Sequence, residues 1–454
     1  MIANLGLLLA LAALIGMALR GVNILLAALL ASLIVGLTNG LSLPDTLLTH
    51  FPFGPLGAFS FAGQFFILFL TGAIFGKLMA ASGAAASIAR AIIDKLGPSQ
   101  TILVTALVCA ILTYGGVVVF VVIFTIYPLG IALMRQSNLP KRLFCGAAAL
   151  GSGTFTMTAL PGTPSVQNVI AAASLGTDLY AGAWVGIIAG AVMLAGGLVY
   201  LNRQQRIAEQ RGEVYESNAQ DEAMVAAAPE ARDAPAVGWA VLPLVVVLGT
   251  ILVPRLMTMM IDREAVDWLA FAVTQPVLWS SFALVLGGLS CIVLFANLRM
   301  RAVETIGAGA NDSVMPLLNT AAVIGFGGVV TQTPGFAAFA QAVIGLDLPP
   351  LVSAAVSVSV VSGIVGSASG GLQIFMATFA EHYLALGVSA EALHRVGAIA
   401  SGGLDTLPHS GAVIAMLTIM GLRHAQAYKD IFVVTVLIPM LATVVAIALA
   451  MVLY

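Results

Sequence analysis

The chain has 454 residues, of which 60% are hydrophobic and only 8% are charged, and its formal net charge is −2. Because soluble domains carry about 25% charged residues, this composition excludes an ordinary water-soluble protein, and the near-neutral charge gives no indication of a nucleic-acid partner. Apolar runs of about 17–25 residues recur along the chain, which is the length that a membrane-spanning helix needs.

The first half, residues 1–201, is predicted to contain four spanning helices and one helix that lies in the membrane interface, at about 2–19, 22–38, 61–80, 182–201 and, in the interface, 83–97. An apolar block at 99–134 is interrupted by T-Y-G-G, and neither part is long enough to span. We therefore expect a re-entrant hairpin there. The apolar segment at 141–173 is also interrupted, which predicts a broken helix.

Residues 202–236 are polar and rich in alanine and proline, so they are predicted to form a solvated cytoplasmic linker. The second half, residues 237–454, repeats the order of the first. Its predicted elements are spans at about 237–253, 276–297, 312–332 and 430–452, a hairpin at 349–386 with its tip in G-S-A-S-G-G, and a broken helix at 392–421.

Lysine and arginine gather in alternate short loops, and such loops face the cytoplasm. The pattern predicts an all-α polytopic membrane protein with ten spanning helices, two re-entrant hairpins and both termini outside. With this orientation the two hairpins enter from opposite faces, so the two halves are predicted to form an inverted repeat of about five elements each.

The two helix breaks, T-A-L-P-G-T-P-S-V-Q-N at 158–168 and D-T-L-P-H-S-G-A at 405–412, are the most informative stretches. Proline and glycine interrupt a helix, and an interrupted helix survives in a membrane only where it is buried in protein or lines a polar cavity. Paired breaks in two halves are typical of secondary transporters. The alternative is that the prolines only kink packed helices.

Hydroxyl groups and glycines at the tips and breaks are therefore predicted to bind the substrate. The predicted substrate-binding residues are Thr113, Tyr114, Gly115, Gly116, Thr158, Thr163, Ser165, Asn168, Ser367, Ser369, Gly370, Gly371, Thr406 and Ser410. A half-helix N-terminus at each break would favour a carboxylate, whereas the freed carbonyl groups would favour a cation.

Asp405 and His409 stand one helical turn apart at the centre of their span and are predicted to couple transport to protons. Burial favours the neutral form of Asp405 and nearby N–H groups favour the anion, as a carrier of exchangeable protons requires. A permanent sodium ligand, a helix cap, and a sodium site at the hairpin tips are the alternatives. His394 and Arg395 are predicted to lie in the membrane interface, and Lys77 to extend towards it.

No catalytic, metal or cofactor site is predicted. The three cysteines, Cys109, Cys145 and Cys291, lie in apolar runs without the spacing of a metal or redox pair. A membrane-embedded enzyme is the alternative from another functional class, and only Asp405 and His409 favour it.

Three stretches carry a family resemblance: F-G-K-L-M-A-A-S-G-A-A at 75–85, L-T-Y-G-G-V at 112–117, and T-F-T-M-T-A-L-P-G-T-P-S-V-Q-N at 154–168. They resemble the gluconate permease family of the ion-transporter superfamily. The resemblance implies an elevator-type arrangement, with a scaffold and a mobile domain of hairpins and broken helices. It also implies proton-driven uptake of gluconate or a related acid across a bacterial inner membrane.

Gly115 and Leu160 stand where sugar-acid members of the family carry an acidic residue and a histidine, which favours a short hydroxycarboxylate as an alternative to gluconate. The predicted function is proton-coupled uptake of a small organic anion. A sodium-coupled carboxylate symporter and a cation/proton antiporter remain as alternatives, and a homodimer is compatible with each.

Overall fold

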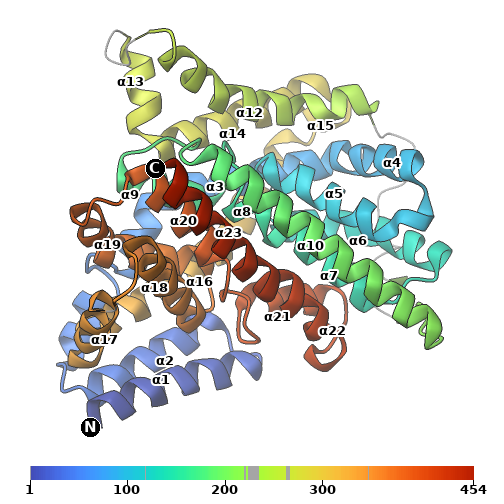
Figure 1. The fold of residues 1–454 in the computed structure, drawn as a ribbon. Helices are drawn as coiled ribbons and strands as arrows, with labels where there is room; N and C mark the ends of the chain where they lie inside the picture. The colour runs from blue at the N-terminus through green and yellow to red at the C-terminus, as the bar shows by residue number, and fades with distance from the viewer. Residues whose placement is uncertain (1, 118, 219–220, 223–234, 262–265, 346) are drawn as a thin grey trace.

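The computed structural model describes residues 2–117, 119–218, 221–222, 235–261, 266–345 and 347–454. Within these ranges the regular structure is entirely helical, as Figure 1 shows, and the predicted all-α class is confirmed. Six described helices are long and apolar enough to cross a membrane: α3 (Ala58–Ala81), α10 (Ala183–Gln210), α12 (Val237–Thr258), α14 (Pro276–Leu294), α16 (Ala302–Val330) and the continuous pair α22–α23 (His424–Leu453). A seventh span is added if the helical segments Ala84–Leu96 and Pro98–Tyr114, which are bent by 108° relative to each other, count as one span.

A central pair, α3 and α16, organises the packing of the long helices. A methyl group on Gly309 of α16 would lie 2.7 Å from the Ile74 Cα of α3, so only glycine allows the two backbones to approach this closely. Helix α2 (Ile24–Thr38) packs on α16, and α14 packs on α3. With α1 (Ile2–Leu19) beside α2 and α12 beside α14, the two pairs occupy opposite edges of the molecule (Figure 1).

Two helical hairpins and two interrupted helices fill the space between these edges. The hairpins are α5 (Thr101–Tyr114) with α6 (Val119–Ser137), and α18 (Pro350–Val365) with α19 (Ala368–Ala385). The interrupted helices are α7 (Lys141–Gly153), α8 (Phe155–Thr158) and α9 (Val166–Leu175) in the first half, and α20 (Ala390–Ser401) and α21 (Gly411–Ile419) in the second.

The long segment His424–Leu453 consists of α22 (His424–Phe432), the π-helical stretch η5 (Val433–Leu437) and α23 (Ile438–Leu453). The remaining described elements are shorter: α4 (Ala84–Leu96), α13 (Asp267–Thr274), α15 (Ala296–Arg299), α17 (Pro334–Ile344), the 3-10 helix η2 (Pro98–Gln100) and the π-helical stretch η1 (Asp45–His50).

The two halves of the chain interlock in matching ways. In each half the first arm of the hairpin packs on the first arm of the interrupted helix, α5 on α7 and α18 on α20. The second arms cross over to the other half, so that α6 packs on α21 and α19 on α9. Helices α10 and α23 run side by side through the middle (Figure 1). Each helix break is therefore enclosed by elements of both halves.

Large apolar side chains cover much of the outer surface. They are exposed along helices at different edges of the molecule, among them Leu8 and Leu9 of α1, Val253 and Leu256 of α12, and Leu441 and Val444 of α23. Exposed apolar surface of this extent marks contact with a partner or a membrane. In an all-helical chain with several helices of spanning length, lipid is the partner that fits.

The structure extends one predicted span. Helix α16 begins at Ala302 and not near residue 312, because the helical hydrogen bonding also includes residues 302–311, among them Glu304 and Asn311. Asp312 consequently lies inside α16, where its carboxylate accepts a hydrogen bond from Lys77 Nζ at 2.8 Å. Lys77 was predicted only to extend towards the interface, and it pairs with this carboxylate.

The predicted solvated linker at 202–236 is also partly packed against the helices. Helix α10 continues to Gln210, and Asp221 is completely buried. Its carboxylate accepts hydrogen bonds from Lys141 Nζ at 2.8 Å and from the hydroxyls of Tyr127 and Tyr215, each at 2.7 Å. A polar residue of the predicted linker thus forms buried hydrogen bonds and is not solvated. Residues 219–220 and 223–234 of this segment lie outside the described residues.

Candidate substrate-binding site

The first break, residues 159–165, lies against the tip of the first hairpin. The Tyr114 hydroxyl donates a hydrogen bond to the Pro161 carbonyl at 2.8 Å. A methyl group on Gly116 would lie 3.0 Å from Pro164 Cγ. Of the tip residues predicted to bind substrate, Tyr114 and Gly116 are therefore in direct contact with the first break, whereas Thr113 Oγ1 lies 3.1 Å from Thr156 Oγ1 of α8 and Gly115 faces Leu244 of α12.

The second break, residues 402–410, lies against the tip of the second hairpin. Gly366, at the end of α18, adopts φ +66°, and a Cβ atom there would lie 2.9 Å from His409 Nε2. The carboxyl group of Asp405 faces the backbone amide of Ala368 at the start of α19. The predicted proton-coupling pair thus sits on the second hairpin tip.

The two breaks also touch each other. A methyl group on Gly402 would lie 2.9 Å from Thr158 Cγ2, so the second break begins beside the last residue of α8, directly before the first break. Both tips and both breaks consequently form one connected region of the molecule, although they come from segments that are far apart in the sequence.

Several predicted substrate-binding residues are used to shape the first break. Ser165 Oγ donates to the Met157 carbonyl at 2.7 Å and accepts from the Asn168 amide at 3.4 Å, which caps α9. The Asn168 side chain donates to the carbonyls of Thr163 and Leu179 at 2.9 and 3.0 Å. These hydrogen bonds hold the non-helical segment in place and are made within the protein.

Other predicted substrate-binding residues, at the second hairpin and break, also make contacts within the protein. Thr406 Oγ1 donates to Thr435 Oγ1 at 2.7 Å, which directs it towards η5. Ser367 Oγ caps α19 by accepting from the Gly370 amide at 3.2 Å, and it lies 3.2 Å from Ser369 Oγ. Ser410 is buried directly before α21.

Six buried polar atoms in this region have no hydrogen-bond partner among the described residues: Thr163 Oγ1, Gln167 Oε1, Ser362 Oγ, Gln373 Oε1, Asp405 Oδ1 and His409 Nε2. Leaving such a group unsatisfied costs about 1–3 kcal/mol, and native proteins rarely tolerate it without a reason. Four of them, on Thr163, Gln167, Asp405 and His409, lie at or directly beside the two breaks, which indicates a place for a polar ligand there.

The sequence predicted half of these atoms through Thr163, Asp405 and His409. Gln167, Ser362 and Gln373 were missed. Gln167 stands inside the T-P-S-V-Q-N motif and could have been found there. Ser362 and Gln373 lie in the two arms of the second hairpin, away from its tip, and no local pattern distinguishes them.

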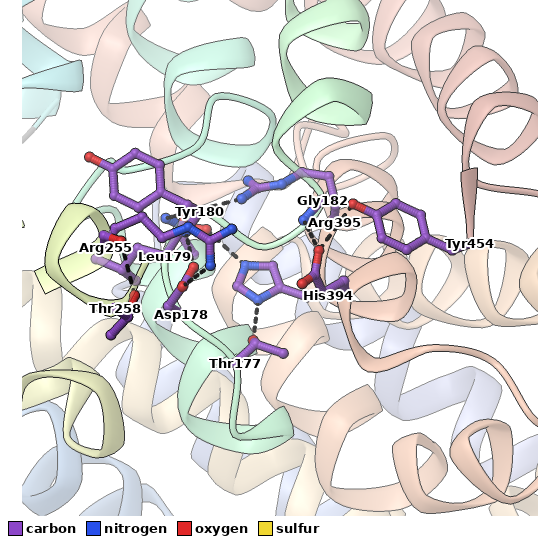
Figure 2. Close-up of polar contacts among 12 residues, drawn as sticks. Thr177, Asp178, Leu179, Tyr180, Gly182, Arg255, Thr258, His394, Arg395 and Tyr454 are labelled. Carbon is purple, nitrogen blue, oxygen red and sulfur yellow. Dashed lines mark hydrogen bonds and ion pairs between the residues drawn. The ribbon is translucent and has the colours of Figure 1, made fainter. Parts of the chain in front are cut away.

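The prediction that His394 and Arg395 lie in the membrane interface is wrong, because both side chains are completely buried. Figure 2 shows them beside residues 177–182, the loop between α9 and α10. Their position within two turns of the start of α20 suggested exposure. The helix instead turns this face towards α9, which hydropathy does not reveal.

An all-helical fold with apolar helices of spanning length and a buried polar region between two interrupted helices defines a multi-pass membrane transporter. Residues 2–452 match the profile of the GntP family permeases, and the chain belongs to this family. The gluconate permease resemblance of the sequence is thereby confirmed, as is the expectation of a transporter and not an enzyme.

Two relatives are transporters as well, and one solved structure has a similar fold. The chain is 38% identical over 401 residues to the uncharacterized transporter YxjC of Bacillus subtilis (strain 168), covering 83% of this chain and 84% of that protein. It is 38% identical over 84 residues to an uncharacterized transporter of Haemophilus influenzae, covering 18% of this chain and 20% of that protein. Its fold is similar to the Alcanivorax borkumensis YdaH transporter, with a TM-score of 0.50 and 14% identity over 96% of this chain and 97% of that chain.

Proposed function

We propose that this permease is a proton-coupled symporter that takes up a small organic anion, gluconate-like or a short hydroxycarboxylate, across the bacterial inner membrane. The observation that carries the proposal is the set of unpartnered buried polar atoms at the two helix breaks. The first break offers neutral hydrogen-bonding groups, which suit an anion. The second break offers titratable groups, which can bind a proton.

The substrate carboxylate is proposed to bind at the N-terminus of α9. Helix N-termini favour anions through their free amides and the helix dipole. Thr163 Oγ1 and the side chain of Gln167, both buried, supply a hydroxyl and an amide at this end of the helix. Such groups suit a carboxylate and an adjacent hydroxyl.

Asp405, assisted by His409, is proposed to carry the coupled proton. Buried ionisable groups inside membrane segments mark ion and proton pathways. Asp405 Oδ1 and His409 Nε2 have no partner within the described part of the chain, and both groups face the second hairpin tip. This proton site adjoins the first break, because Gly402 of the second break lies against Thr158.

We further propose ten spanning segments in an inverted repeat that works as an elevator. The short helices α1 and α2 and the two interrupted helices add four spans to the six long ones. The matching contacts of the two halves support a repeat, and the backbone packing of α3 with α16 supports a rigid scaffold. The hairpins and interrupted helices would then form the mobile domain.

Cysteine labelling tests the topology. Gln136 and Ala385 are exposed near the ends of α6 and α19, the second arms of the two hairpins. In a variant without the three native cysteines, Gln136→Cys should react with a membrane-impermeant maleimide only from the cytoplasmic side, and Ala385→Cys only from outside. Labelling of both from the same side would overturn the inverted repeat.

Uptake by proteoliposomes tests the function. With an inward proton gradient, radiolabelled gluconate, glycerate or lactate should accumulate, and an internal pH dye should report proton entry that depends on the acid. Accumulation driven by a sodium gradient alone would favour the sodium-coupled alternative. No uptake of any of the three acids under either gradient would refute the proposal of organic-acid transport.

A further inference from the structure

Arg395 is a completely buried arginine whose three guanidinium nitrogens all bind backbone carbonyls. Nε donates to Ala181 at 2.9 Å, Nη1 to Ala159 at 3.1 Å and Nη2 to Leu179 at 3.2 Å. None of the ion pairs formed by the described residues includes Arg395. A helix break leaves carbonyls without an intrahelical donor, and the Ala159 carbonyl at the start of the first break receives its donor from this side chain.

His394 holds the same break through a second contact. Its Nε2 lies 2.8 Å from Asn168 Oδ1, and its Nδ1 lies 2.7 Å from Thr177 Oγ1. Because the Asn168 amide nitrogen donates to the carbonyls of Thr163 and Leu179, its Oδ1 must accept, so His394 Nε2 carries the hydrogen.

The chain leaves room for this arrangement. A methyl group on Gly186 of α10 would lie 2.9 Å from Arg395 Cδ and would also collide with the Ala159 carbonyl. The Gly162 amide donates to the Leu179 carbonyl at 2.8 Å, so this one oxygen accepts from the break as well as from Asn168 and Arg395. Break and loop are therefore fixed as one unit by these hydrogen bonds.

We propose that His394 and Arg395, which belong to the second half of the chain, are positioning residues for the first break. They hold its non-helical backbone in place and thereby orient Thr163 and Gln167 for the organic anion. The role in substrate binding rests on the proposed function. Among the buried side-chain atoms at the first break, the Thr163 hydroxyl and the Gln167 carbonyl oxygen have no hydrogen-bond partner within the described residues, so they are available to a ligand.

Conservative variants separate positioning from general stability. Arg395→Lys keeps the charge but provides one nitrogen in place of three, so it cannot bind all three carbonyls. His394→Gln keeps a donor near the position of Nε2, whereas His394→Leu removes it. Arg142→Lys is the matched control. Arg142 lies near the start of α7 and pairs with Glu213 and Asp430.

Hydrogen exchange tests the positioning without a substrate. In Arg395→Lys and His394→Leu the amides of 159–168 should exchange at least tenfold faster, with 402–410 unchanged. His394→Gln and Arg142→Lys should protect 159–168 as the wild type does. Unchanged exchange of 159–168 in Arg395→Lys and His394→Leu would overturn the proposal, even if the wild type transported none of the acids tested.

Uptake kinetics then test the consequence for the substrate. Arg395→Lys and His394→Leu should raise KM for the transported acid at least tenfold, with the maximal rate per folded protein kept within about threefold. His394→Gln and Arg142→Lys should keep the wild-type KM. Faster exchange together with an unchanged KM would overturn the role in substrate binding and leave organic-acid transport itself intact.

Discussion

The two helix breaks contain the same L-P motif, and side chains bind backbone carbonyls in both, as Tyr428 and His424 do in the second, but the atoms left without a partner differ. In the first break, side chains bind the carbonyls of Ala159, Pro161 and Thr163, and the unpartnered atoms are a neutral hydroxyl and a neutral amide oxygen. In the second break, the unpartnered atoms belong to Asp405 and His409, which can exchange protons. The comparison suggests that the first break binds the substrate and the second carries the coupling ion.

Asp221 shows what a structural carboxylate in this protein looks like. It is completely buried, and both of its oxygens accept hydrogen bonds, from Lys141 and Tyr127 on one and from Tyr215 on the other. Burial disfavours its charged form, but the hydrogen bonds from Lys141, Tyr127 and Tyr215 outweigh burial and hold the pKa of Asp221 below its usual value. Asp405, with one oxygen unpartnered, differs from this pattern.

The largest expected effect comes from the hairpin that supports the second break. A methyl group on Gly371 would lie 2.6 Å from the Ser362 backbone nitrogen, so Gly371→Ala should force α18 and α19 apart and abolish uptake. Gly411→Ala is the control, because a methyl group there meets no atom within 4 Å. Uptake and thermal unfolding in detergent measure both; wild-type uptake by Gly371→Ala would contradict the close packing.

Removing titration from the second break should uncouple transport. Asp405→Asn keeps the size of the side chain, so substrate exchange between the two sides of a proteoliposome should continue. Accumulation driven by a pH gradient should be lost. Asp312→Asn, at a partly exposed carboxylate paired with Lys77, should keep both activities. If Asp405→Asn still accumulates the acid fully, the division of roles between the breaks is wrong.

Asp221→Asn should destabilise the protein without uncoupling it. Breaking a buried ion pair costs about 3–5 kcal/mol, and the partner Lys141 is only 8% exposed. Because the pKa of Asp221 is lower in the folded state, its stabilisation is present above the unfolded pKa and is lost as the pH falls through the folded value. The difference in free energy of unfolding between wild type and variant should therefore shrink below about pH 4. A difference that stays constant down to pH 3 would contradict this.

Two threonines in the first interrupted helix separate substrate-facing from structural hydroxyls. Thr163→Val removes an unpartnered hydroxyl, so stability should be unchanged or raised by about 1 kcal/mol, while affinity for the acid falls about tenfold. Thr158→Val removes a hydrogen bond to the Thr154 carbonyl, so stability should fall by about 1 kcal/mol with affinity unchanged. Thermal unfolding and uptake kinetics distinguish them, and the same effect in both would refute the assignment.

The smallest effect is expected at the tyrosines that bind each break. Tyr114→Phe removes a hydrogen bond to Pro161, and Tyr428→Phe removes one to the Thr406 carbonyl at 3.2 Å. Each should lower stability by about 1 kcal/mol. Only Tyr114→Phe should also raise KM for the acid, because only it acts on the first break. A larger KM change in Tyr428→Phe would reverse the proposed roles.

Local features of the sequence already predicted the membrane class, the helices and where they are interrupted. Prolines and glycines act on the backbone within one or two turns, so they can be interpreted without knowing the fold. Helix α5 ends at Tyr114 and α18 at Val365, directly before the glycines of the two predicted tips. The family followed from the same stretches, because they contain its motif.

Only the tertiary structure decided which polar groups are buried and what satisfies them. From sequence, His394, Arg395 and Asp221 were placed in polar surroundings, since an isolated charge avoids the interior. Each is nevertheless completely buried, because groups from other parts of the chain satisfy it, 214 to 236 residues away for Arg395 and 80 to 94 residues away for Lys141 and Tyr127 around Asp221. The sequence determined where the helices break, and the packing of the two halves decided which atoms at each break are left for the substrate.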